Sequence, residues 1–94
     1  DLEAQAFYGV ISPIVSDKYN LEPDVVAKIA QAVTAIVRRH DTVDWKTSID
    51  VHNRIRQDID DFFYEMESKD GIVISLDDVD IILESVLNVA MRRF

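Results

Sequence analysis

The stretch EPDVVAKIAQAVTAIVRRH, residues 22–40, decides the fold class of this chain. At about 100° per residue, its apolar side chains share one arc of a helix, and its polar side chains fall opposite. Pro23 and Asp24 suit a first helical turn, and the basic residues at 38–40 suit the negative end of the helix dipole. The pattern predicts a long amphipathic helix with an apolar face of Val25, Val26, Ile29, Ala30, Ala32, Val33, Ile36 and Val37. The opposite face carries Lys28, Gln31, Thr34, Ala35 and Arg38.

A helix is also expected on the N-terminal side, at about residues 2–12. Its apolar residues share one side, and Pro13 ends or kinks it because a proline disfavours the helical conformation of Ser12. The structure of residues 13–22 is left open. That side consists of Leu2, Ala6, Phe7, Val10 and Ile11.

Two more helices are expected on the C-terminal side, at about 48–67 and 76–93. Thr47 or Ser48 is a plausible N-cap for the first, and Ser75 with Asp78 resembles a capping box for the second. Residues 72–74, IVI, predict a short extended piece that forms half of a β-bridge. We therefore expect a mainly α fold, a small bundle of about four helices with a short β-bridge near residues 72–74.

Length and charge restrict the function. The 94 residues fit one domain, residues 1–94, and the helical pattern at the first residues predicts a piece of a longer protein. Formal net charge is −8, and residues 58–94 carry ten acids against Lys69, Arg92 and Arg93. Such a surface repels phosphate. Without cysteine or a membrane-length apolar run, the sequence predicts a cytoplasmic protein with no membrane contact.

No catalytic, cofactor-binding or metal-binding site is predicted. The chain has no glycine-rich phosphate loop, nucleophile elbow or zinc-protease helix. His40 and His52 lie on different segments, and His52 is expected to pack at the edge of an apolar stripe. The neighbouring carboxylates of Asp58, Asp60 and Asp61 would diverge on a helix rather than converge on one ion.

Four arginines offer the main functional alternative. Arg38 and Arg39 end one predicted helix, and Arg54 and Arg56 open the next, so a hairpin would gather them into a phosphate-facing patch. This alternative is a nucleic-acid-binding helical module. Against it, Arg54 precedes Asp58 and Arg56 precedes Asp60 by four residues, which predicts pairs that neutralise the guanidiniums on their own helix.

The connector TVDW, residues 42–45, holds the only tryptophan. In an extended connector Val43 and Trp45 would point the same way, with Asp44 opposite. Trp45 would then cover the open end of the helix pair, and its indole N–H would need a carbonyl or water. Asp44 would accept from backbone N–H groups at the next helix start or pair with an arginine. We expect a structural role for Val43, Asp44 and Trp45.

The order of these elements resembles the C-terminal helical region of type I restriction enzyme motor (R) subunits. The similarity covers VVAKIAQAVTAIVRR, VDW at 43–45, VHNRIRQDIDDFF at 51–63, the closing helix from Leu76, and AFYGVI at 6–11. Many relatives carry basic residues through the helix after the tryptophan, where this chain has Asp58, Asp60 and Asp61. Of the family's DNA-contacting positions, only Arg54 and Arg56 remain as candidates.

The resemblance implies a large parent subunit that cleaves and translocates DNA with ATP and magnesium. Its C-terminal helical domain would join the motor domains of its own chain to the methyltransferase core of modification and specificity subunits. The expected function is thus non-catalytic assembly, without a cofactor in this fragment and with DNA met only through the parent complex. Four residues are candidate partner contacts, although singly exposed apolar side chains are also common without function. They are Ile81, Met91, Arg92 and Arg93.

Overall fold

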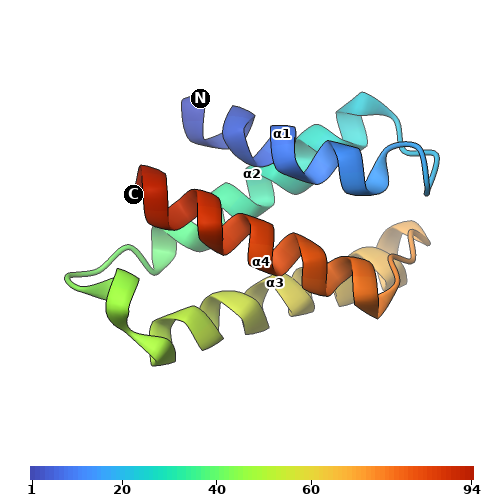
Figure 1. Ribbon diagram of the computed structural model, residues 1–94. Coiled ribbons are helices and arrows are strands. Elements are labelled where there is room, and N and C mark those ends of the chain that lie inside the picture. The colour runs from blue at the N-terminus through green and yellow to red at the C-terminus, as the bar shows by residue number, and fades with distance from the viewer.

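The computed structural model describes residues 1–94 and contains four α-helices (Figure 1). They are α1 (Leu2–Val15), α2 (Pro23–Arg39), α3 (Ile49–Asp70) and α4 (Leu76–Arg93). A short 3₁₀ helix, Trp45–Thr47, lies in the connector between α2 and α3. The predicted mainly α fold is confirmed.

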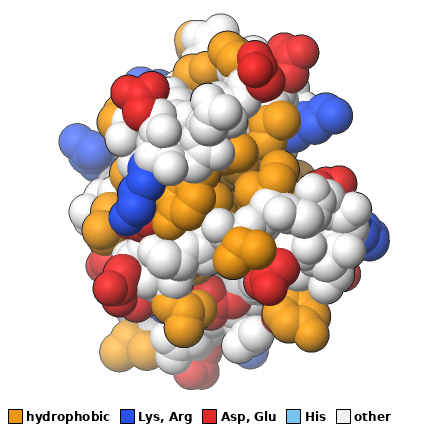
Figure 2. Space-filling model, turned by 90° about the vertical axis from the view of Figure 1, so that its right-hand side faces the viewer, with side chains coloured by type: hydrophobic (Ala, Val, Ile, Leu, Met, Phe, Trp, Pro, Cys, Tyr) orange, Lys and Arg blue, Asp and Glu red, His pale blue; other side chains and the backbone are white.

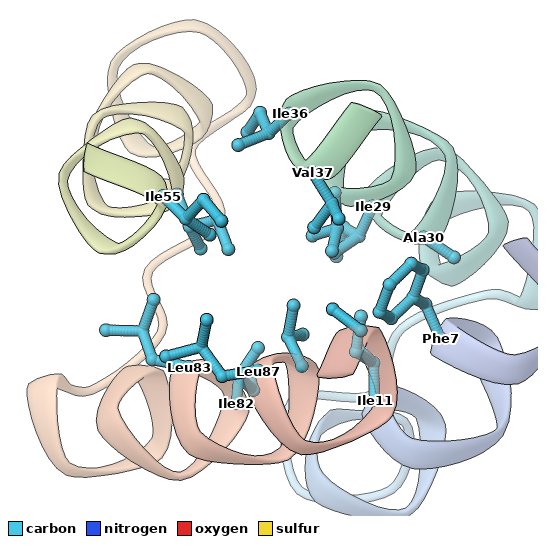
Figure 3. Packing of buried hydrophobic residues seen from close by; sticks show 14 of the residues in the cluster. Phe7, Ile11, Ile29, Ala30, Ile36, Val37, Ile55, Ile82, Leu83 and Leu87 are labelled. Carbon is cyan, nitrogen blue, oxygen red and sulfur yellow. The ribbon is translucent and has the colours of Figure 1, made fainter. Parts of the chain in front are cut away.

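One hydrophobic core holds the four helices together. α1 and α3 each pack against both α2 and α4, and apolar side chains from every helix converge between them (Figure 3). Every helix contributes at least one fully buried isoleucine, and removing each such side chain from water contributes about 1.5–3 kcal/mol. These isoleucines are Ile11, Ile29, Ile55, Ile59 and Ile82. None of the helices combines the length and the apolar character needed to cross a membrane.

α2 forms as its sequence predicts, with one exception on its polar face. Pro23 occupies the first turn, and Arg38 and Arg39 lie in the last. Thr34, expected on the exposed side, is only 2% exposed because α1 packs over that side of α2. Its hydroxyl donates to the Ala30 carbonyl at 2.7 Å, which satisfies the buried polar group.

α1 continues past the proline that was expected to end or kink it. Pro13 lies inside the helix, which runs to Val15. The extra turn is held by the fully buried Val15 side chain and by the Ser16 N–H, which donates to the Ser12 carbonyl at 2.9 Å. Packing of this turn against the core thus outweighs the hydrogen bond that Pro13 cannot donate.

The β-bridge expected near residues 72–74 is absent. α3 runs to Asp70, three residues past its expected end, and Gly71 closes it at φ +70° by donating to the Glu67 carbonyl. Ile72 and Ile74 pack on the core while Val73 is exposed, but no other extended segment lies alongside to pair with them. The segment is therefore an extended connector without a partner strand.

Candidate interaction surfaces

The connector end of the molecule buries Trp45 but not Val43. Trp45 is 3% exposed and Val43 is 90% exposed, so the expectation that they point the same way is wrong. Asp44 has φ +60°, a conformation that aspartate tolerates better than most residues, and this turn breaks the alternation of an extended chain. The Asp44 side chain caps nothing; instead its carbonyl accepts from the Thr47 N–H and hydroxyl, both at 3.2 Å.

Trp45 belongs to an aromatic cluster. His52 of α3 meets it edge to face, with ring centroids 5.9 Å apart. Phe94 lines the same surface hollow as Trp45 and stacks on Phe7 of α1 at 6.1 Å. The indole N–H of Trp45 donates to no protein group, and Nε2 of His52 is buried without any partner. His52 packs at the edge of the apolar stripe of α3, as the sequence predicts.

The four arginines do not form an open basic patch. Arg38 pairs with Asp1 at 2.9 Å and Glu3 at 3.5 Å, both at the start of the chain. The predicted pairs within α3 do not form. Arg56 pairs instead with Glu84 of α4, and Asp58, the expected partner of Arg54, pairs with Arg39 at the end of α2. Only Arg54 of the four arginines has no ion pair.

Asp58 is the acceptor that ties α3 to the end of α2. Its Oδ2 lies 2.7 Å from Nε2 of His40 and 3.6 Å from the Arg39 guanidinium. Asp60 and Asp61 do not share this site. No group of three or more His, Cys, Asp or Glu side chains is placed to hold a metal ion.

A polar network closes the opposite end of the molecule. Asp78, 7% exposed, accepts from the Tyr19 hydroxyl, from Lys18 Nζ at 2.8 Å and from the Ser75 hydroxyl at 3.1 Å. Ser75 caps α4 by accepting from the Asp78 N–H at 3.2 Å, and the Ser75 N–H donates to the Tyr19 hydroxyl at 3.0 Å. The predicted capping serine is confirmed, but Tyr19 replaces the Asp78 carboxylate as the reciprocal acceptor.

This network shifts two ionisable groups. Hydrogen bonds from Lys18 and then Tyr19 lower the pKa of Asp78 below its ordinary value of 3.8. The same contact with Asp78 raises the pKa of Lys18 above 10.5. Lys18 and Tyr19 were missed in the sequence, because they lie in residues 13–22, whose structure was left open. Tyr19 is 59 residues away from Asp78 along the chain. Only the Ser75 cap signalled this site in the sequence.

The four candidate partner contacts are all exposed. Ile81 is 51% and Met91 37% exposed, and Arg92 and Arg93 lie in the last turn of α4. Arg92 donates back to the Asn88 carbonyl at 3.3 Å. Ile81 and Met91 are ten residues and so about 15 Å apart along α4. They therefore do not form one continuous apolar stripe.

Two surface grooves bring exposed side chains closer together than these four residues lie. The larger, about 860 Å³, lies between α1 and α2 over small side chains such as Ala4 and Ala27. The smaller, about 280 Å³, lies between the C-terminal half of α3 and the start of α4. Figure 2 looks at the end of the molecule where the α1–α2 and α3–α4 connectors lie, and hydrophobic side chains gather there, with acidic side chains around them.

Fold and surface define a class: a small helical domain with one apolar core, charges paired between helices, and apolar grooves open to solvent. The comparison with known families is more specific. The family described as "Type I restriction enzyme HindI endonuclease subunit-like, C-terminal" matches residues 1–87, and the chain belongs to this family. Comparisons with curated proteins and with solved structures gave no match.

Proposed function

We propose that this domain is the non-catalytic assembly domain of an ATP-dependent, DNA-translocating endonuclease subunit, and that it docks the motor onto the methyltransferase core. Membership of a family named for the C-terminal region of such an endonuclease subunit carries the proposal. The grooves between the helices support it, because apolar side chains that are open to solvent there gain free energy when a partner protein covers them.

The proposal divides labour within the parent protein. DNA cleavage, translocation, ATP and magnesium belong to domains outside these 94 residues, and DNA reaches the domain only through the assembled complex in the cytoplasm. The contacts are made with modification or specificity subunits and with the motor domains of the same chain. Ile81, Met91, Arg92 and Arg93 are available for them.

Capture of the purified methyltransferase core by the immobilised chain tests the proposal. We expect capture by this chain and by a longer C-terminal piece of the subunit. The variant Ile55→Asp, which places a charge at a fully buried position, should unfold the chain and abolish capture. Capture by the longer piece but not by this chain would show that the contact lies elsewhere in the subunit.

The ion pairs count against the nucleic-acid-binding alternative. Of its four candidate arginines, three already meet carboxylates of the domain, and the net charge is −8. We therefore expect no association with duplex DNA in fluorescence anisotropy at physiological salt. Steeply salt-dependent binding that falls in Arg54→Ala and Arg56→Ala would favour this alternative.

A further inference from the structure

We propose that the groove between α3 and α4 is the docking site for a basic, amphipathic segment of a partner protein, with an apolar anchor flanked by lysines or arginines. The inference rests on the proposed docking function and names the surface and the partner's chemistry. The groove lies between the second half of α3 and the first turn of α4.

Apolar side chains form its base and its walls. Phe63 and Val79 are 6% and 4% exposed, and Ile74 is partly buried beside them. Tyr64 and Leu76 stand above this base at 72% and 81% exposure. Two large apolar side chains kept in water beside an apolar base are a surface that gains free energy when a partner covers it.

The rim of the groove is acidic and its charges are unused within the domain. Asp60 and Glu67 make no ion pair, and Asp61 only accepts from the Gln57 amide at 2.9 Å. No lysine or arginine lines the groove. The nearby Lys69 pairs with Glu65 instead, at 3.7 Å. These carboxylates present a net negative field to whatever occupies the groove.

The negative charge of the rim and the volume of the groove restrict what can bind there. Nucleic acid is repelled by the carboxylates. A second copy in a symmetric contact would bring the same acidic rim against itself. The volume of about 280 Å³ is at the lower end of the range of about 300–1,000 Å³ of small-molecule sites, and it suits one or two anchoring side chains of a protein. A basic flank would then meet the unpaired carboxylates.

Removal of the apolar wall is the first test. The chain offers a matched control: Leu76 and Ile49 each follow a capping serine, open a helix and are 81% and 74% exposed. Binding of the purified methyltransferase core is measured by calorimetry for the chain and for Leu76→Lys and Ile49→Lys. We expect Leu76→Lys to weaken binding by about tenfold or more and Ile49→Lys by less than about twofold. Equal effects would overturn the proposal.

Removal of the rim charges is the second test. The triple variant Asp60→Asn, Asp61→Asn, Glu67→Gln should weaken binding and flatten its dependence on salt between about 0.02 and about 0.15 M. A control triple removes the same charge at the other end of the molecule, at Asp41 and Asp44 of the α2–α3 connector and at Asp50 in the first turn of α3, each changed to asparagine, and should leave both properties near wild type. Unchanged affinity and salt dependence in the groove triple would overturn the proposal.

The outcomes separate the two proposals. No binding by the wild-type chain rejects docking through this domain and the groove with it. If the wild-type chain and the groove variants bind the core equally well, the groove is rejected as the docking site, but docking through this domain is not. Self-association of the chain, measured by light scattering and lost in Leu76→Lys, would assign the groove to a second copy and overturn the basic partner. Thermal melts by circular dichroism verify that each variant is folded.

Discussion

Ser48 and Ser75 cap α3 and α4 at opposite ends of the molecule, and what surrounds each cap differs (Figure 1). Near Ser48 the aromatic side chains of Trp45 and His52 pack together, and the serine hydroxyl accepts only from the Val51 N–H, at 3.3 Å. Near Ser75 the cap is part of a polar network with Tyr19 and Asp78.

The difference arises at the third helical residue after each cap. It is Val51 in α3 and Asp78 in α4, and only a carboxylate can collect donors from a distant loop. One end therefore depends on packing, which changes little with pH, and the other depends on the ionised form of Asp78. This contrast yields four predictions.

The largest effect is expected at the aromatic end. Trp45→Ala should lower the free energy of unfolding by about 3–5 kcal/mol, because it removes a buried indole and leaves a cavity against His52. Urea denaturation measures it, and the loss should be the same at mildly acidic and neutral pH. Val43→Ala, at a site 90% exposed two residues away, should change stability by less than about 0.5 kcal/mol. A loss below about 1 kcal/mol for Trp45→Ala would contradict the aromatic closure.

The polar end should show a pH-dependent effect of intermediate size. The folded-state pKa of Asp78 lies below 3.8, so its stabilisation is fully present above that pH and is lost as pH falls through the lowered pKa. Asp78→Asn should therefore destabilise the domain strongly at neutral pH and progressively less as the solution is made more acidic. Melting curves of both proteins across the acid range measure this.

Lys18 makes the stability of the same network depend on pH in alkaline solution, where stability is lost as pH rises rather than as it falls. Its pKa is raised above 10.5, so its contribution is present below that pH and is lost as pH rises through the higher folded-state pKa. Asp77→Asn is the matched control, since Asp77 shares the first turn of α4 but makes no hydrogen bond or ion pair in the network, and its charge makes the smallest contribution to the raised pKa of Lys18. A penalty for Asp78→Asn that stayed constant with pH, or one matched by Asp77→Asn, would refute the network.

The sequence predicts features of this fold that are local and misses those that join distant segments. The apolar arc of α2 and the serine caps lie within a few residues, so periodicity and capping rules find them. The Tyr19–Asp78 contact spans 59 residues and leaves no periodic signal.

The ion pairs were mispredicted for the same reason. The predicted Arg54–Asp58 pair follows helix spacing, but the folded chain brings Arg39 and His40 to Asp58 from α2. Likewise, burial of Trp45 follows from its size, whereas exposure of Val43 depends on the left-handed turn at Asp44, which alternation rules ignore.

The two capping serines should differ when each is replaced by alanine. Ser48→Ala loses one backbone hydrogen bond and should cost about 1 kcal/mol. Ser75→Ala also loses the hydroxyl that donates to Asp78, so it should cost about twice as much as Ser48→Ala. In the Asp78→Asn background the two serine penalties should converge, and a double-mutant cycle measures this. Equal penalties in the wild-type background would remove the distinction between the caps.

Replacing each histidine by phenylalanine should change the free energy of unfolding least, and the two changes should have opposite signs. Nε2 of His52 is buried without a partner, so His52→Phe keeps an aromatic edge against Trp45, removes the unpaired nitrogen and should stabilise the domain by about 1 kcal/mol. Nε2 of His40 lies 2.7 Å from Asp58, so His40→Phe should destabilise it. Chemical denaturation at neutral pH measures both. Destabilisation by His52→Phe would mean that Nε2 holds a polar partner such as water, and that the Trp45 end also contains a polar contact.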